Sequence, residues 1–563
     1  MSDAALVATA VLVALCAVLG VAVPVPVLVA VVVLALVHRH PVEVALALAL
    51  VAGGRSDASL RALEAPLPDR VEGTAQLVGD PEPGRFGTTV ELRIGGRRWQ
   101  AQVGRSDEWV LRPLLTGDHV VVAGRPSAFH GAPVGWQRSR HLAGRLVVTR
   151  ISRGPPAAPW YRLANGVHRL VADGASSFEP SARSLYLGLV LGDDRAQGDL
   201  DRFRFQATGL GHLLAVSGQN VAFVLLLARP VMARCGLRTR WLVGLAVLAL
   251  FVLLTRAEAS VLRAAAMASV ALLAATSGRL VSGARVLALA VVGLLLADPL
   301  LVTGLGFQLS VCATVGLLVG VRPLSERLPG PRWLADALAC TIAAQLATAP
   351  LLLGLNGGVP SVATVTNVLA VPVAGAVMVL GLTVGVVAGG LVAPVASVLQ
   401  WPSRLLVGWV EAVAATGSRS PLPLLGPTRL ALLVGAGAAL LLRRGRRWPV
   451  AVAVALVAVA VRPVPPPVGP TVVGPGVTVC GATVVLDGAV DVVDALEALQ
   501  RAGVVRAEVV VGPPSESSVH VAEQLDATLQ APTGRAGGDR SDAGSGRSAG
   551  PAAASEAPCT VAP

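Results

Sequence analysis

Residues 206–228 read Gln-Ala-Thr-Gly-Leu-Gly-His-Leu-Leu-Ala-Val-Ser-Gly-Gln-Asn-Val-Ala-Phe-Val-Leu-Leu-Leu-Ala, and this stretch decides the fold class. It is apolar enough for a membrane, yet polar side chains and three glycines interrupt its centre. The hydrocarbon core penalises polar side chains and irregular backbone unless protein or a water-filled cavity surrounds them. The stretch therefore predicts a broken helix at a buried site or along a translocation path. Its polar side chains, the first candidates for lining such a path, are His212, Ser217, Gln219 and Asn220.

The composition excludes an ordinary soluble protein. The 563 residues are 54% hydrophobic, with a mean hydropathy of +0.68, which predicts many membrane spans. The net charge is +12, and all 46 basic residues are Arg because the sequence contains no Lys. This positive balance suits either cytoplasmic loops that face anionic lipid or a nucleic-acid partner, and charge alone does not choose between them.

The chain opens with membrane segments followed by a less hydrophobic domain. Apolar runs over residues 4–20, 22–37 and 41–52 predict N-terminal transmembrane segments within residues 1–52. If Arg39 is cytoplasmic, three spans place residues 53–160 outside. Five segments of period-2 alternation in that domain predict an external OB-like β-barrel, with a hairpin turn at Gly95-Gly96. The expected strands cover residues 70–78, 88–94, 97–103, 120–124 and 144–151.

The remaining membrane region follows a short linker. Residues 161–205 mix polar and apolar positions and predict an amphipathic, interfacial linker. Asp193 and Asp194, which follow Gly192, are candidate functional carboxylates, but a solvated turn or helix end is the simpler interpretation. Residues 206–461 form the expected transmembrane domain, with the basic loop 443–447 in the cytoplasm. Its candidate spans after the opening stretch cover residues 241–255, 257–277, 284–297, 305–321, 333–354, 361–378, 379–398, 404–416, 428–442 and 448–461.

Five motifs in this domain occur in a family order. They are Gly209–Gly218, Glu258–Met267, Asp298-Pro299 followed by Gly306–Ser310, Gln345 with Ala349-Pro350, and Asn367–Pro372. Together they resemble the ComEC family, inner-membrane channels that import DNA during bacterial transformation. The family usually has His at the position of Asn220. The resemblance implies a multi-pass channel for single-stranded DNA in the bacterial cytoplasmic membrane, an external DNA receptor and a cytoplasmic motor ATPase.

Four further polar residues at membrane depth are candidates for the DNA path. Arg263 lies within an apolar run, where a lone cation costs at least about 2.5 kcal/mol, so it requires a partner, a cavity or a phosphate. Amide side chains at similar depth suit a pore for a polyanion, but they also suit hydrogen bonds that join neighbouring helices. Asn220 has a comparable alternative, as the N-cap of the following helix. The amide candidates are Gln308, Gln345 and Asn367.

The barrel region supplies external candidates for contact with DNA. Residues 55–160 contain 15 Arg against 10 acidic residues, a net charge of +5, with aromatic residues interleaved. OB barrels bind single strands by stacking bases on aromatic side chains beside a basic groove. The alternative is that these aromatics fill the barrel core. The candidates for external contact are Arg97, Arg98, Trp99 and Trp109.

The C-terminal region predicts neither a metal site nor an enzyme. Strand and helix patterns in residues 462–530 resemble the opening of the metallo-β-lactamase-like domain found in many family members. A binuclear site needs clustered ligands, but His520 is the one histidine here and no His-x-His-x-Asp-His motif occurs. We therefore expect a truncated α/β remnant without metal ligands, catalytic residues or cofactor, and a disordered tail over residues 531–563.

Two other functions remain open from the sequence. A secondary transporter for a small solute also uses broken helices at the membrane midplane, and an inverted repeat, which we do not find, would favour it. A membrane-bound metallo-hydrolase would require stoichiometric metal. A P-loop is absent, since its motif requires Lys.

Overall fold

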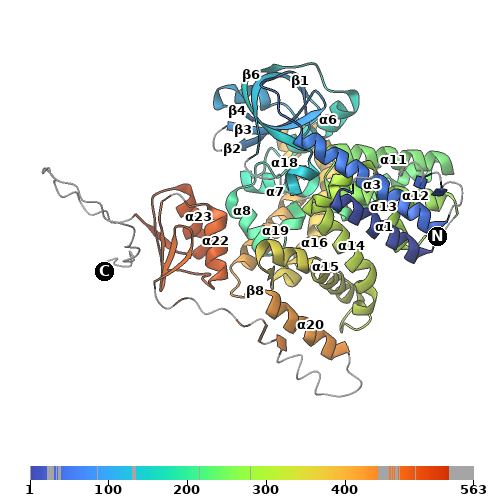
Figure 1. Cartoon of the computed structure of the whole chain (residues 1–563). Coiled ribbons are helices and arrows are strands. Elements are labelled where there is room, and N and C mark those ends of the chain that lie inside the picture. The colour runs from blue at the N-terminus through green and yellow to red at the C-terminus, as the bar shows by residue number, and fades with distance from the viewer. Residues whose placement is uncertain are drawn as a thin grey trace, which may run out of the picture. The chain divides into compact units, whose positions relative to one another are not determined.

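The computed structural model describes residues 2–21, 31–32, 34–35, 40–84, 87–129, 135–214, 216–278, 281–441, 456–457, 459–460, 462, 467, 470–488 and 490–531. The chain divides into two compact units (Figure 1). The first comprises residues 1–196, 212–351 and 368–410, and the second comprises residues 197–211, 352–367 and 411–563. The predicted basic loop 443–447, the span 448–461 for the most part, and the tail from residue 532 lie outside the described residues.

The N-terminal β domain is a closed barrel of five strands, β1, β3, β4, β5 and β6, and the short β2 pairs with β3. Around the barrel the order is β1-β3-β4-β6-β5, and β5 returns to β1. All of these pairings are antiparallel except β4 with β6, which is parallel. The strands are β1 (Val71–Leu77), β2 (Glu82–Gly84), β3 (Gly87–Ile94), β4 (Arg97–Val103), β5 (His119–Ser127) and β6 (Leu142–Arg153).

Alternation of side chains explains the barrel core. Along β3, Val90, Leu92 and Ile94 point inward and pack with the inward residues of the other strands. Gly95 and Gly96 adopt φ values of +56° and +83°, which suit the two-residue turn that joins β3 to β4. The five predicted strands and this turn are therefore confirmed. Short helices η1 (Arg105–Asp107), α4 (Glu108–Leu111) and α5 (Gly135–Ser139) fill the connections.

The segments flanking the barrel are more helical than the sequence predicts. The helix formed by the third apolar run does not end at residue 52. It continues as α3 (Pro41–Glu64) through the polar residues that follow. The predicted linker contains α6 (Pro159–Gly174) and α7 (Pro180–Leu191), and α7 is largely buried. Gly389 of α17 (Val386–Gly389) approaches α6 so closely that a Cβ there would lie 1.9 Å from the Leu170 carbonyl oxygen.

Four described helices are long and apolar enough to cross a membrane. They are α11 (Leu237–Leu254), α14 (Leu305–Ser325), α15 (Arg332–Asn356) and the continuous run from α16 to α17. Shorter helices of the same character flank them. Those that are apolar are α1 (Asp3–Leu19), α10 (Gly218–Ala233), α12 (Ala259–Thr276), α13 (Gly283–Ala297) and α20 (Pro427–Leu441). The described part of the chain is thus mostly helical, with four candidate membrane-spanning helices and a β-barrel domain.

One predicted pair of spans is wrong. The sequence predicts separate spans over residues 361–378 and 379–398, whereas α16 (Ala363–Leu380) continues through the π-helical segment η3 (Gly381–Gly385) into α17. The single helix ends at Gly390, and α18 (Ala393–Leu399) and α19 (Trp401–Ser418) follow. No proline or charge interrupts residues 373–389, so the backbone has no reason to turn at residue 378.

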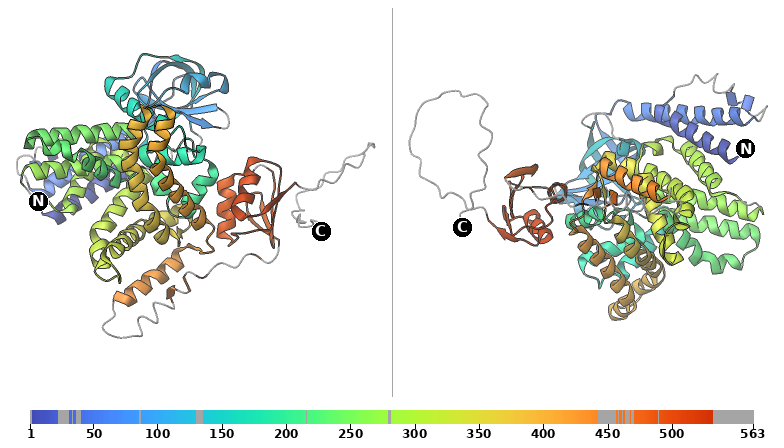
Figure 2. Two further views of the ribbon diagram at one scale, coloured as in Figure 1. Left: turned by 180° about the vertical axis from the view of Figure 1, so that it is seen from behind. Right: turned by 90° about the horizontal axis from the view of Figure 1, so that it is seen from below.

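The C-terminal region is a folded α/β body with its own core (Figure 2). Its sheet has the order β13-β12-β11-β10-β9; β9, β10 and β11 are antiparallel, and β11, β12 and β13 are parallel. Residues of α8 (Asp199–Ala207) join this core. The other elements are β9 (Thr471–Gly474), β10 (Val477–Cys480), β11 (Thr483–Leu486), α22 (Val492–Arg501), β12 (Val509–Val511), α23 (Glu516–Leu525) and β13 (Thr528–Gln530).

Candidate functional site

Residues 206–228 contain a break between two helices. The short α9 (Gly211–Leu214) ends before Val216, and α10 begins at Gly218. Ser217 is the N-cap of α10 and has extended backbone angles, and its Oγ donates a hydrogen bond to Asn220 Oδ1 at 3.3 Å. The interpretation of Asn220 as the N-cap is therefore wrong. Asn220 lies in the first turn, because the glycine at 218 already allows the helix to start there.

Helix α12 packs against this break. The Ser260 hydroxyl donates a 2.5 Å hydrogen bond to the carbonyl oxygen of Val216, one of the backbone groups that the interruption leaves outside a helix. Close approach also requires a small residue at 218. A Cβ on Gly218 would lie 3.0 Å from an Arg263 terminal nitrogen and 3.3 Å from the Ala264 methyl. The glycine of the break thus makes room for the Arg263 side chain.

Arg263 is buried between three elements that are far apart in sequence. Its Nε donates to Ser310 Oγ on α14 at 2.7 Å, and one terminal nitrogen lies 3.1 Å from the Met267 sulfur on its own helix. Within the described part of the chain, no carboxylate lies within ion-pair distance of Arg263, whose side chain is 7% exposed. The structure therefore brings together Gly218, Arg263 and Ser310, one residue from each of three sequence motifs, around an uncompensated cation.

The other candidates in the membrane domain make more local contacts. Gln308 donates to the Val302 carbonyl in η2 (Pro299–Thr303) at 2.8 Å, and Asn367 donates to the Ala363 carbonyl one turn earlier in α16 at 2.7 Å. These bonds fit the interpretation of amides as structural links. Gln345 is half-buried on α15, while His212 and Gln219 are exposed on α9 and α10.

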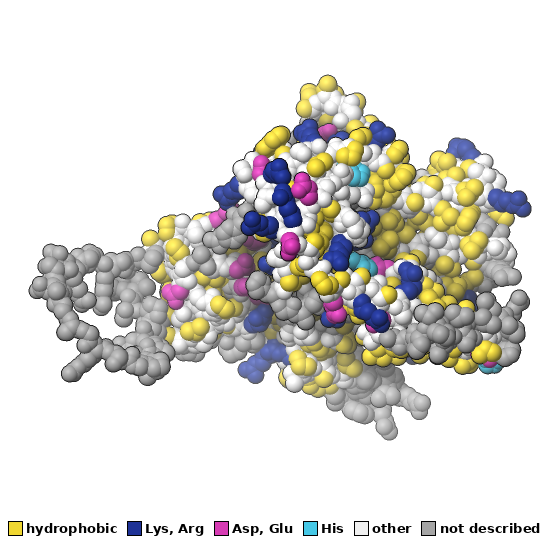
Figure 3. Space-filling view, turned by 45° about the horizontal axis from the view of Figure 1, so that its top comes forward, with side chains coloured by type: hydrophobic (Ala, Val, Ile, Leu, Met, Phe, Trp, Pro, Cys, Tyr) yellow, Lys and Arg dark blue, Asp and Glu magenta, His cyan; other side chains and the backbone are white. Residues whose placement is uncertain are grey.

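The barrel candidates divide into buried and exposed residues. Trp99 is 1% exposed and belongs to the barrel core, so its assignment as an external contact is corrected in favour of the core interpretation. Its position on β4 faces inward because inward and outward side chains alternate. Trp109 is 64% exposed on α4. On the face drawn in Figure 3, arginine and acidic side chains are interspersed.

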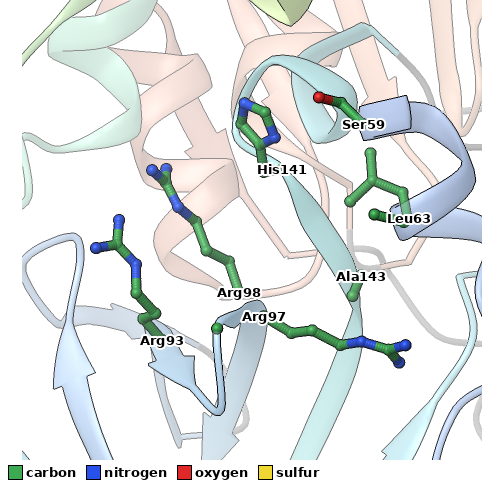
Figure 4. Close-up of a pocket in the computed structure, with 9 residues that line it drawn as sticks. Ser59, Leu63, Arg93, Arg97, Arg98, His141 and Ala143 are labelled. Carbon is green, nitrogen blue, oxygen red and sulfur yellow. The ribbon is translucent and has the colours of Figure 1, made fainter. Parts of the chain in front are cut away.

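Arg97 and Arg98 line a pocket of about 420 Å³ beside the β3–β4 turn (Figure 4). Arg93 lines it as well, although it is not among the external contacts predicted from the sequence. Residues from α3 and from the start of β6 complete the wall. The full lining is Ser59, Ala62, Leu63, Arg93, Gly96, Arg97, Arg98, His141 and Ala143.

The structure also contains a buried ion-pair network that the sequence did not predict. Asp193 accepts hydrogen bonds from Arg195 at 2.7 Å on each carboxylate oxygen and lies 3.2 Å from His168 Nε2 on α6. The prediction of a solvated turn is wrong for Asp193, since its side chain is 10% exposed. The residue does follow a helix end, as predicted, but the neighbouring α6 covers it.

The network continues into the barrel through Asp80, in the loop between β1 and β2. Asp80 lies 2.9 Å from Arg256 Nε and accepts two hydrogen bonds from Thr116, each 2.7 Å long. Arg256 also donates to Asn165 on α6 at 2.9 Å and adopts a φ of +58°, a conformation that is rare outside glycine. No periodicity or spacing links residues 80, 193 and 256, so only the fold reveals this cluster.

These contacts keep both carboxylates ionised. Burial raises the pKa of Asp80, but Arg256, Arg195 and the Thr116 hydrogen bonds outweigh it and hold the pKa below its usual value. Burial opposes ionisation of Asp193 too, but hydrogen bonds from Arg195 and His168 hold its pKa well below its usual range. Asp80, His168 and Asp193 each have one atom that could bind a metal ion, and these three atoms lie within 4.8 Å of one another. The arginines already compensate both acids, which makes the cluster an ion-pair network.

Comparison with known proteins gives two matches. Residues 189–449 match the family Competence protein. ComE operon protein 3 of Bacillus subtilis (strain 168) is 27% identical over 285 residues, which are 50% of this chain and 36% of that protein. These two matches support assignment of the chain to the ComEC family. The alignment thus spans about a third of the relative's length, and no solved structure matches.

The matched region contains the whole helix break and its partners. Gly218, Arg263 and Ser310 all lie within residues 189–449 of the competence domain. The barrel lies outside it, so the barrel's role is argued from its own geometry.

Proposed function

We propose that this ComEC-family chain is a multi-pass channel that conducts single-stranded DNA across the bacterial cytoplasmic membrane during transformation. Membership of the competence family supports a role in DNA uptake. The observation that carries the proposal is the buried Arg263 beside the helix break. A cation that is neither paired nor solvated is costly inside a membrane protein and marks a functional site. A passing phosphate would supply the missing negative charge.

The barrel supports an external single-strand-binding role. Numbering its five main strands 1 to 5 along the chain, the order around the barrel is 1-2-3-5-4, with strands 3 and 5 parallel. We infer an OB-like barrel from this arrangement. Such barrels bind oligonucleotides through the face of strands 2 and 3 and neighbouring loops. Of the predicted contacts, Arg97, Arg98 and exposed Trp109 remain available for this role.

We further propose conduction without cleavage and without ATP hydrolysis by this chain. The region after residue 462 contains one histidine and lacks a His-x-His-x-Asp-His motif, which supports its interpretation as a metallo-β-lactamase-like remnant without metal ligands. The absence of Lys from the sequence rules out a P-loop. The proposed partners are accordingly an external DNA receptor and a cytoplasmic motor ATPase.

The proposal is tested by following labelled DNA into cells that lack the gene. We expect DNA to bind at the cell surface but not to become protected from added nuclease, and a plasmid copy of the gene should restore protection. Normal protection in the deletion strain would rule out the channel function. A small-solute transporter would instead leave DNA uptake intact and change uptake of its solute.

A further inference from the structure

The β3–β4 hairpin places two arginines directly opposite each other. Arg93 on β3 is the register partner of Arg98 on β4, and Ile94 is the partner of Arg97. Like charges in directly opposite positions destabilise a strand pair. Burial is the main cause that lowers the pKa of Arg98, and repulsion by the neighbouring Arg93 lowers it further. A local conflict of this kind is expected at functional sites, where a ligand offsets it.

The pocket around these arginines contains no acidic side chain. Its remaining wall comes from Ser59, Ala62 and Leu63 of α3, together with residues of the turn and of β6. In Figure 4 the guanidinium groups of Arg93 and Arg98 lie side by side and extend toward the His141 side of the pocket, while Arg97 points the other way. Arg98 donates to the Arg140 carbonyl at 3.3 Å, a neutral partner that leaves its charge in place.

The two acids whose charges act on Arg98 already have other partners. Glu91 accepts a 2.7 Å hydrogen bond from Arg140. Asp298 lies 2.9 Å from His141 Nε2 and accepts a hydrogen bond from the Leu300 amide at 3.1 Å. Among the described residues neither Arg93 nor Arg98 forms an ion pair, so the two arginines present two positive charges to the pocket.

We propose that this pocket holds a backbone phosphate of single-stranded DNA on its way to the membrane domain, an inference that rests on the proposed function and names its first contact. Paired guanidinium forks match the oxygens of a phosphate in geometry and charge. The lining contains no Phe, Tyr or Trp side chain for stacking a base, and its one imidazole, that of His141, is held by Asp298. The site consequently recognises the backbone without regard to sequence.

The pocket residue His141 and two nearby segments, in α3 and at the start of α5, contact residues 297–303 that precede α14. His141 contacts Asp298, Arg55 of α3 donates to the Ala297 carbonyl at 2.9 Å, and Thr303 donates to the Gly135 carbonyl at 3.2 Å. Residues 297–303 lead directly into α14, the helix whose Ser310 binds Arg263. The pocket residue His141 thus contacts the segment that leads into α14, the helix that contacts the proposed path.

The test measures binding of a fluorescein-labelled oligo(dT) to the full chain in phosphatidylcholine nanodiscs over a range of salt concentrations. The variant carries Arg93→Ala and Arg98→Ala. The matched control carries Arg125→Ala and Arg145→Ala, which remove two exposed arginines from β5 and β6 outside the pocket. Each lost phosphate contact on a single strand reduces the slope of log K against log salt by about 0.7. Because the pocket holds one phosphate, we expect the pocket variant to lose about 0.7 from the slope and the control to lose less.

Thermal unfolding separates a binding role from a structural one. Removing opposed like charges should leave the melting temperature of the pocket variant unchanged or raise it. A lower melting temperature, or an oligo(dT) slope that stays at the wild-type value, would overturn the inference. So would a variant that loses affinity only for nanodiscs containing phosphatidylglycerol, because the pocket would then hold a lipid phosphate. Normal DNA import in the deletion strain contradicts the channel function itself, whereas these results bear on the pocket alone.

Discussion

At the scale of single residues, Arg263 is the residue on which the proposed function rests most directly. Its guanidinium has a hydroxyl and a thioether as partners, and a glycine of the helix break provides its space. The sequence alone singled out this residue from its charge at membrane depth. It did not predict that Ser310 and Gly218 would be the neighbours, because contacts between separate helices have no sequence signal.

The first prediction concerns the charge of Arg263. Arg263→Ala should lower nuclease-protected DNA uptake about tenfold or more, because a hydrogen bond to a charged group contributes roughly 1.5–3 kcal/mol. Arg263→Lys should retain part of the uptake, since it keeps the cation, and Ser310→Ala should have a smaller effect than Arg263→Ala. Immunoblots of membrane fractions control for insertion. Equal uptake by the alanine and wild-type proteins would assign Arg263 to structure.

The second prediction concerns acid sensitivity of the Asp193 network. The pKa of Asp193 is lower in the folded protein than its usual value of about 3.9 in an unfolded chain, so its stabilising contribution is complete above about pH 4 and decreases as the pH falls further. Asp193→Asn should destabilise the protein by about 3–5 kcal/mol at pH 7, because it leaves Arg195 without its buried partner. Unfolding midpoints at pH 7 and pH 3 provide the measurement. The variant should lose less stability over this range than the wild type does, and an identical loss in both would contradict the account.

At the scale of elements, the alternation of apolar and polar residues predicted the strands correctly. It predicted all five barrel strands, and hydropathy located most of the apolar helices within a few residues. Failures occurred where a helix continued through polar or glycine-containing sequence, as in α3 and in the run from α16 to α17. Trp99 shows the same limit for a side chain, since aromatic character alone does not say which face of a strand it occupies.

The third prediction tests the close packing of α6 against the run of η3 and α17. Gly389→Ala should destabilise the protein by about 1–3 kcal/mol or more, because its methyl would meet the Leu170 carbonyl at 1.9 Å and backbone cannot move aside cheaply. Gly408→Ala on α19 is the matched control, with no atom within 4 Å of the new methyl. It should be neutral or slightly stabilising, since alanine favours a helix. Denaturant titration of both variants in detergent would show this difference, and equal midpoints would refute the packing argument.

At the scale of the whole molecule, the competence domain and the barrel have different grounds for their assigned roles. The match to the competence family covers residues 189–449. The role of the barrel, in contrast, is inferred from its topology and from its arginine pocket. The strand order of the barrel was not predictable in detail, because it depends on the parallel pairing of β4 with β6 between distant segments. The C-terminal body folds around its own core, and its sequence contains no His-x-His-x-Asp-His motif.

The most direct test of the central claim is photo-crosslinking in cells that are importing labelled DNA. A photo-crosslinking amino acid replaces Gln219, which is exposed on α10 next to the helix break, or Leu242, which is exposed on α11 and serves as the control. The account predicts that single-stranded DNA crosslinks at position 219 during uptake and does not crosslink at position 242. Internalised DNA without any crosslink at 219, or with equal crosslinking at both positions, would contradict a DNA path along the helix break.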